Sequence, residues 1–103
     1  MIPEQIVCKY LPDVELLAQL AEEATELAQA ALKLRRAIDG TNWTPKTLQE
    51  CKDALAEEIA DVEGVLSALD FGTALLDYDR VWTVKGGKMR RWAERLEGHH
   101  AND

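Results

Sequence analysis

Two long stretches of the chain carry apolar residues at steps of three and four, which is the spacing of one helix face. In the first stretch these positions are Leu17, Leu20, Ala24, Leu27, Ala31, Leu34 and Ile38. In the second they are Leu48, Cys51, Leu55, Ile59, Val62, Leu66 and Leu69. We find no strict alternation of apolar and polar residues, which would indicate a strand. The pattern therefore predicts an all-α fold, in which two long helices form the main part of an antiparallel helical bundle.

The first long helix is expected to run from Pro12-Asp13 to Asp39-Gly40. Gly40 is suited to the left-handed conformation that commonly follows the last helical residue. Residues 1–11, which precede this helix, are expected to form an irregular lead-in.

The second long helix is expected to start with Thr44 as its cap and Pro45 in the first turn. Alternatively the helix starts later, because the run from Thr47 to Glu50 has the form of a capping box. In both cases Phe71-Gly72 is expected to end the helix.

A third helix is expected from about Asp79 to Leu96, and it would complete the bundle. Its apolar face is either Val81, Val84, Lys88 and Trp92, or Trp82, Met89, Trp92 and Leu96. Gly86-Gly87 falls in the middle, and each glycine costs about 1 kcal/mol against alanine in a helix interior. We therefore predict a break, a kink or a late start there. Residues 98–103 are expected to form a flexible tail, with His99-His100 disordered.

Each long helix carries two acids on the same flank of its apolar stripe. Glu23 and Glu26 lie at about −60° and −120° from the stripe centre of the first helix, at about 100° per residue. Glu58 and Asp61 lie at the same angles on the second helix. Short loops make consecutive helices antiparallel neighbours, and that arrangement keeps matching flanks on one side. We therefore expect the four carboxylates to converge.

Converging carboxylates repel one another and raise one another's pKa, and a divalent cation relieves this repulsion. Mg²⁺ and Mn²⁺ prefer oxygen ligands. A di-iron centre would instead use Glu-x-x-His pairs, and the histidines here are confined to His99 and His100. A single Glu-x-x-Glu motif is usually a solvated helix face, and that interpretation stays open beside a metal site.

The length of 103 residues predicts a single domain spanning residues 1–103. A chain this short buries a modest share of its surface, so we expect homo-oligomerisation to complete the core. The net charge of −7 argues against nucleic acid or an anionic membrane as the partner.

Cys8 and Cys51 have no spacing that indicates a disulfide framework or zinc, and Cys51 is expected to be a buried thiol. The sequence shows no signal peptide and no apolar run of about 20 residues, which predicts a cytoplasmic protein.

The acidic motifs resemble those of a known family. Glu23-x-x-Glu26 and Glu58-x-x-Asp61, the second within the string Glu-Glu-Ile-Ala-Asp-Val, resemble the MazG-like superfamily of all-α nucleoside triphosphate pyrophosphohydrolases. The likeness extends from about residue 16 to residue 96. It implies hydrolysis of a (d)NTP to the monophosphate and pyrophosphate by a metal-activated water, in homodimers or homotetramers. It also implies that the four acids are the catalytic residues and the ligands of Mg²⁺, for which Mn²⁺ is a possible substitute.

The resemblance further implies basic residues some two dozen positions after the last acid. Lys85 and Lys88 stand there, and together with Arg91 they are the candidate phosphate-binding residues. The alternative is that this basic run is a solvated helix face. Trp43 is a candidate for stacking on the nucleobase, although it can equally pack over the helix ends or at a subunit interface. Trp82 and Trp92 are expected in the core or at an interface.

Three departures from the family pattern bear on the substrate. The spacer between the acidic motifs is longer than usual, Lys88-Met89 replaces a common Lys-Asn pair, and Gly86-Gly87 interrupts the third segment. The alternative function is therefore a non-catalytic helical dimerisation or nucleotide-binding module with a degenerate site. Neutralising the acids distinguishes the two, because an enzyme loses activity on Glu58→Gln or Asp61→Asn while its fold stays intact.

Overall fold

The structure, a computed structural model, describes residues 1–40 and 45–101, with side chains as far as His99. Helices make up most of this part: α1 (Pro3–Tyr10), α2 (Asp13–Asp39), α3 (Leu48–Gly72) and α4 (Tyr78–Ala101). The described residues include no strand, which confirms the all-α class. None of the described helices combines the length and the apolar character needed to cross a bilayer.

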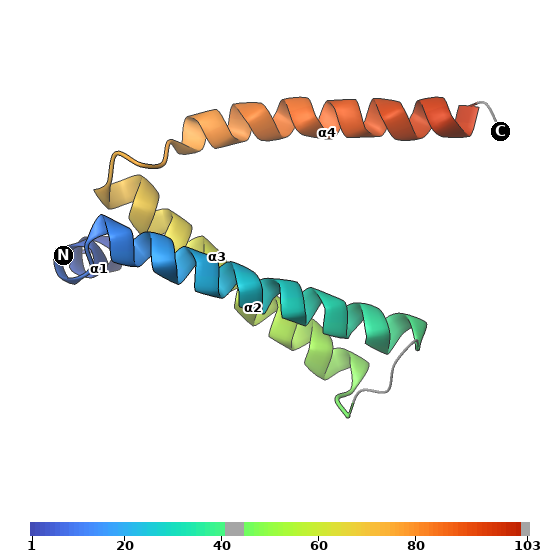
Figure 1. The fold of residues 1–103 in the computed structure, drawn as a ribbon, viewed down its shortest axis with the longest axis horizontal. Coiled ribbons are helices and arrows are strands. Elements are labelled where there is room, and N and C mark those ends of the chain that lie inside the picture. The colour runs from blue at the N-terminus through green and yellow to red at the C-terminus, as the bar shows by residue number, and fades with distance from the viewer. Residues whose placement is uncertain (41–44, 102–103) are drawn as a thin grey trace.

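Helices α2 and α3 form an antiparallel pair that is the main packed unit of the chain (Figure 1). We call the contact strip between them the seam. Leu16 and Ala30 of α2 and Cys51 of α3 are buried along it. The predicted stripe of α2 is only partly covered, since Leu17 is 45% exposed and Ile38 is 68% exposed. One partner helix covers a narrower strip than the apolar arc that the sequence pattern marks.

Capping residues are present at the end of α2 and at the start of α3. Gly40 follows α2 in the left-handed region with φ of 68°, and its N–H donates to the carbonyl oxygen of Arg36 at 2.9 Å. The prediction that Pro45 lies in the first turn of the second helix is wrong, because α3 begins at Leu48 and the later start is the one adopted. Thr47 Oγ1 accepts from the N–H of Glu50 at 3.1 Å, and the Glu50 carboxylate accepts from the N–H of Thr47 at 3.2 Å. This reciprocal pair satisfies the free N–H groups of Thr47 and Glu50 and makes Thr47 the cap of the helix. Pro45 therefore lies before the helix.

The prediction of an irregular lead-in over residues 1–11 is wrong, because α1 is a helix. The side chain of Gln5 accepts from the N–H of Ile2 at 2.9 Å and caps its first turn. The thiol of Cys8 donates to the carbonyl oxygen of Ala68 on α3 at 3.2 Å, and Cys8 packs against the buried cluster that includes Leu16. A helix of eight residues is unstable alone and depends on this docking, which local periodicity does not reveal.

Helix α4 also differs from its prediction. Asp77 Oδ1 caps its start by accepting from the N–H of Asp79 at 3.0 Å. The helix continues without interruption through Gly86-Gly87, so the predicted break is wrong. The other residues of this long helix offset the cost of about 1 kcal/mol per glycine. Residues 98–101, predicted as part of a flexible tail, continue the helix, and His99 belongs to it.

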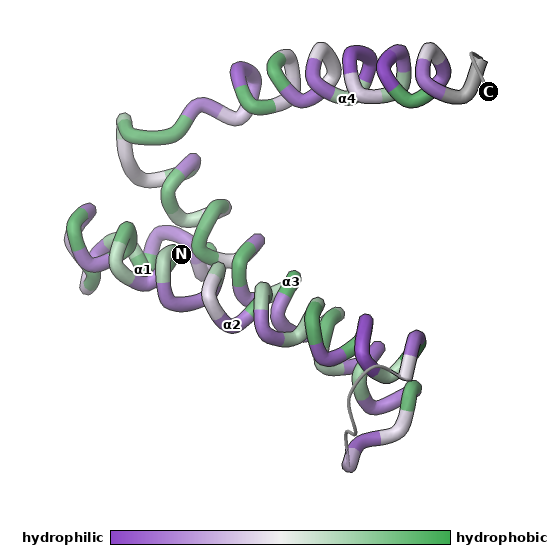
Figure 2. Tube along the Cα trace, turned by 45° about the vertical axis from the view of Figure 1, so that its right-hand side comes forward, coloured by the Kyte–Doolittle hydropathy of each residue, from purple (hydrophilic) through white to green (hydrophobic). Residues whose placement is uncertain are grey.

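Within this chain α4 stands apart from the α2–α3 pair (Figures 1 and 2). The radius of gyration is 17.7 Å, whereas a compact domain of about 100 residues has about 13 Å. Trp82 is 64% exposed and Trp92 is 54% exposed, so neither lies in a core of the single chain. The larger apolar side chains of α4 are all substantially exposed: Val81, Trp82, Val84, Met89, Trp92 and Leu96. The third helix therefore does not join the other two within one chain.

Candidate metal centre

Two acids occupy positions of the seam that apolar residues fill elsewhere. Glu23 lies seven residues after Leu16 and seven before Ala30, both of which are buried. Glu58 lies seven residues after the buried Cys51. Since seven residues are nearly two full turns, each acid shares the inward direction of its apolar neighbours. Both side chains are half-buried between α2 and α3.

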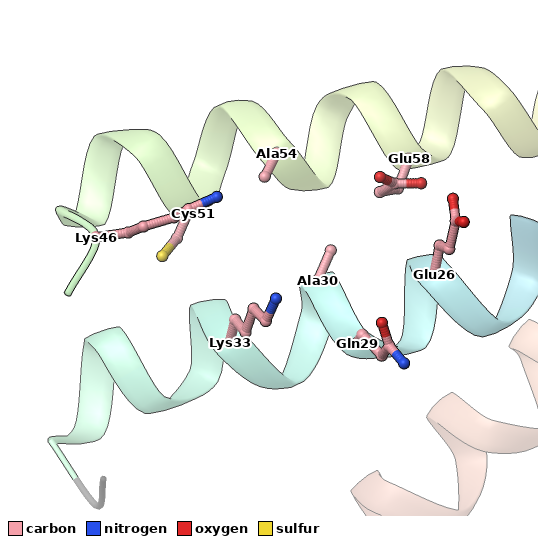
Figure 3. Close-up of a pocket in the computed structure, with 8 residues that line it drawn as sticks. All are labelled: Glu26, Gln29, Ala30, Lys33, Lys46, Cys51, Ala54 and Glu58. Atoms are coloured by element: carbon pink, nitrogen blue, oxygen red, sulfur yellow. The ribbon is translucent and has the colours of Figure 1, made fainter. Parts of the chain in front are cut away.

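Glu23 and Glu58 meet a third acid, Glu26, at the edge of the seam. Each of the three offers one carboxylate oxygen, and these atoms lie within 4.8 Å of one another. We call this group the carboxylate cluster. Figure 3 shows Glu26 and Glu58 facing each other from the two helices. The cluster confirms that part of the predicted convergence which involves these three residues.

Two oxygens of the cluster are shielded from solvent without a hydrogen-bond partner. They are Oε2 of Glu23 and Oε2 of Glu58. The other oxygen of Glu23 accepts from the side-chain amide of Gln19 at 2.7 Å. Buried polar atoms are normally paired, so two orphaned carboxylate oxygens at one point are suited to a partner that carries positive charge.

The electrostatics of the cluster agree with this interpretation. The negative charge of Glu23 raises the pKa of Glu26, and desolvation and the charges of Glu58 and Glu22 raise it further. None of the described lysines or arginines forms an ion pair with the three acids. The negative charges therefore repel one another, and a cation placed among them would relieve the repulsion.

The donor set fits Mg²⁺ or Mn²⁺. All three groups are carboxylates, and hard divalent cations prefer oxygen ligands. The orphaned oxygens of Glu23 and Glu58 leave ligand positions available. Three protein ligands also leave room for water and phosphate oxygens, which Mg²⁺ commonly retains.

Asp61, predicted as the fourth ligand, is not a member of the carboxylate cluster. Its side chain is exposed, and it lines a separate depression of about 410 Å³ together with Glu23, Gly64 and Val65. Three residues of helix turn Asp61 about 60° away from Glu58, and an aspartate is one methylene shorter than a glutamate. Asp61 thus approaches the cluster from the side of Glu23 without reaching it.

The predicted substrate-binding residues lie elsewhere in this chain. Lys85 and Lys88 line a depression of about 590 Å³ beside α4, and Arg91 lines another of about 330 Å³. Neither depression includes an acid of the carboxylate cluster. The ammonium group of Lys85 instead lies 4.4 Å from the ring centre of Trp82. Trp43, the candidate for stacking on the base, lies outside the described residues.

A cavity that sequence reasoning missed adjoins the cluster (Figure 3). It has a volume of about 390 Å³, and Glu26 and Glu58 line it together with Lys33 and Lys46. Lys33 lies seven residues after Glu26, so the helical period already placed both on one face. Lys46 precedes α3, and no periodicity connects it to the acids. Cys51 also lines this cavity as a buried free thiol, as predicted.

Comparisons with known proteins add no relative. No family model matches this sequence, and neither a curated protein nor a solved structure matches the chain.

Proposed function

We propose that this chain is a Mg²⁺-dependent nucleoside triphosphate pyrophosphohydrolase, which converts a (d)NTP to the monophosphate and pyrophosphate. The observation that carries the proposal is the meeting of Glu23, Glu26 and Glu58 with two orphaned oxygens. The resemblance of the acidic motifs to the MazG-like superfamily supports the same reaction. Phosphoryl-type transfer requires positioning and charge neutralisation more than a special nucleophile, and an acidic site with a cation supplies both.

The three clustered acids would hold the cation, with Asp61 as an additional ligand from the neighbouring depression. When bound, a divalent cation supplies charge neutralisation for the phosphates and activation of water. In the reaction, a water oxygen forms a bond to the α-phosphorus. The bond between that phosphorus and the oxygen bridging the α- and β-phosphorus atoms breaks. Pyrophosphate leaves with that oxygen and its electron pair. One carboxylate of the cluster orients the water and accepts its proton.

Substrate binding in this proposal involves a homodimer or homotetramer. Lys85, Lys88 and Arg91 are carried by α4, which lies apart from the cluster of its own chain. Assembly would cover the exposed apolar residues of α4 and bring its basic residues to the site of another copy. Trp43 stays the candidate for contact with the base.

A second candidate function is a non-catalytic helical dimerisation or nucleotide-binding module. Three observations favour it: Asp61 lies outside the cluster, Lys85 and Lys88 lie on a separate helix, and Met89 stands where the family commonly has asparagine. Such a module would keep the acids without turnover. Their neutralisation would then stabilise the fold by removing repulsion.

The two candidates are separated by a product assay. The purified protein is incubated with a panel of NTPs and dNTPs plus Mg²⁺, and the products are separated by chromatography. Monophosphate with pyrophosphate, lost on addition of chelator, is the expected result. Glu58→Gln and Asp61→Asn should each abolish it, whereas Glu57→Gln, an exposed neighbour outside the cluster, should retain it.

Other products or none would contradict the proposal. Diphosphate with orthophosphate would identify a different phosphohydrolase. The absence of turnover with Mg²⁺ and with Mn²⁺ across the panel would favour the non-catalytic module.

A further inference from the structure

The cavity between α2 and α3 has opposite charges at its two ends. Figure 3 shows the carboxylates of Glu26 and Glu58 at one end, and the ammonium groups of Lys33 and Lys46 toward the other. Its volume of about 390 Å³ lies within the range of about 300 to 1,000 Å³ that is typical of small-molecule sites. The cavity is therefore suited to an anionic ligand. Such a ligand would contact a cation held by the acids at one end and the lysine side chains at the other.

The two lysines have no partner among the described residues. Both residues are exposed, and neither ammonium group forms an ion pair or a hydrogen bond there, although acids line the same cavity. Lysine is a compact, strongly hydrated charge that commonly binds phosphate. Two unpaired ammonium groups that line one cavity from different segments are therefore available to an anionic ligand between them.

The helix geometry keeps this cavity open and directs the lysines into it. Ala30 of α2 and Ala54 of α3 line the stretch between its two ends, and their small side chains leave space there. Side chains on a helix lean toward its N-terminus. Lys33 consequently leans back toward the turn that holds Glu26, which lies about 10 Å away along the axis at 1.5 Å per residue. Lys46 extends into the cavity from the segment before α3.

We propose that this cavity binds the phosphate chain of the nucleotide, with Lys33 and Lys46 contacting the phosphates farthest from the carboxylate cluster. This inference rests on the proposed function, and it assigns the leaving pyrophosphate to residues of the same chain as the acids. A polyphosphate fits both ends, because a cation on the acids binds its near oxygens and the lysines bind its far oxygens. The assignment differs from the one based on Lys85, Lys88 and Arg91, which lie on α4.

The test measures binding of inorganic tripolyphosphate to the full chain by calorimetry in the presence of Mg²⁺. Lys33→Met and Lys46→Met should each weaken tripolyphosphate binding about tenfold, because each removes one charge-assisted hydrogen bond. The double variant should bind tripolyphosphate more weakly than either single variant. Lys52→Met is the matched control, since Lys52 is exposed on α3 outside the cavity and removes the same charge. Mg²⁺ binding measured without phosphate should be unchanged in all of these variants.

Assays of hydrolysis separate this inference from the proposed function. Turnover with an unchanged tripolyphosphate affinity in both lysine variants would overturn the inference and leave the function standing. Lysine-dependent tripolyphosphate binding without turnover of any NTP would support the inference and overturn the function. A wild-type protein that binds no tripolyphosphate with Mg²⁺ would overturn the inference directly.

A competition experiment identifies the source of the phosphate chain. An NTP that displaces tripolyphosphate, with a displacement weakened in Lys33→Met and Lys46→Met, supports nucleotide in the cavity. An NTP that fails to displace tripolyphosphate would overturn that assignment and indicate free polyphosphate as the ligand.

Discussion

Glu23 and Glu58 occupy equivalent positions on α2 and α3: each takes an inward position of the seam, and each keeps one carboxylate oxygen shielded and without a hydrogen-bond partner. Apolar residues at these positions would pack between the two helices without the desolvation penalty of a carboxylate. Shielding a charge without a partner is unfavourable. The pair therefore lowers the stability of the ion-free chain, and we attribute its presence to a ligand that binds between the helices.

The first prediction concerns stabilisation by divalent cations. Binding to the folded state at ten times the dissociation constant adds about 1.4 kcal/mol to the free energy of unfolding. For a chain of this size we expect the melting temperature to rise by roughly 5 to 10 °C with Mg²⁺ or Mn²⁺. Glu23→Gln and Glu58→Gln should lose most of this rise, because each removes a carboxylate of the cluster.

Glu57→Gln is the control for that experiment, since Glu57 is exposed and outside the cluster. Thermal unfolding of the three variants with cation and with chelator gives the comparison. Equal stabilisation of all three variants would show that the cation binds elsewhere.

The second prediction concerns pH. The pKa of Glu26 is raised above its ordinary value of 4.5, chiefly by Glu23. Between 4.5 and the raised value the folded chain binds more protons than the unfolded chain, so the contribution of Glu26 to stability is highest below this window and falls as pH rises through it. Glu26→Gln removes that dependence. Without metal, the variant should therefore gain stability over the wild type as pH rises.

Urea unfolding in chelator from about pH 4 to pH 8 measures this difference. Glu57→Gln again serves as control and should follow the wild type. A difference between Glu26→Gln and wild type that stays constant with pH would contradict the prediction.

The third prediction concerns the contact of α1 with α3. A Cβ atom at Gly72 would overlap the side chain of Cys8. Gly72→Ala should therefore destabilise the chain by about 1 to 3 kcal/mol through overpacking. At Gly86 an added Cβ meets nothing within 4 Å, so Gly86→Ala should increase helix stability by up to about 1 kcal/mol. The urea midpoints of the two variants should move in opposite directions, and a shared direction would contradict this account of the docking.

The fourth prediction concerns assembly through α4. Val84 is partly exposed on this helix and lines the depression beside Leu75 and Leu76. We expect the wild type to be a dimer or tetramer by light scattering, and Val84→Asp to be a smaller species, because a charge at a buried apolar contact is unfavourable. Thr83→Asp adds the same charge at an adjacent exposed position and is the control. A wild type that is monomeric at all concentrations would exclude assembly.

Local signals predicted much of this fold. The three-and-four spacing identified both long helices, Gly40 marked the end of the first, and the Thr47–Glu50 capping box, the alternative to a start at Thr44-Pro45, marked the start of the second. The angular positions of the acids about their helix axes predicted that four carboxylates converge; those of Glu23, Glu26 and Glu58 do, whereas Asp61 lies outside the cluster. The helices and their caps were predictable because each depends on residues within one or two helical turns of each other. The convergence needed one further rule, that a short loop makes consecutive helices antiparallel neighbours.

Other features depended on contacts between distant residues. Helix α1 is too short to form without docking on α3. The continuity of α4 through Gly86-Gly87 has another cause, since the other residues of this long helix offset the cost of the two glycines. Lys46 reaches the cavity from a segment with no helical period of its own.

By itself the sequence determined the helix class, the two long helices and the acids on their shared flank, because periodicity reports the direction of each residue about its own axis. The tertiary structure decided how far each helix is rotated toward its partner. That rotation placed Glu23 and Glu58 inside the seam, left Asp61 beside it, and set Lys33 and Lys46 over a cavity that Ala30 and Ala54 keep open. The reason is that packing between two helices follows the side-chain volumes of both, and neither sequence stretch contains that information alone.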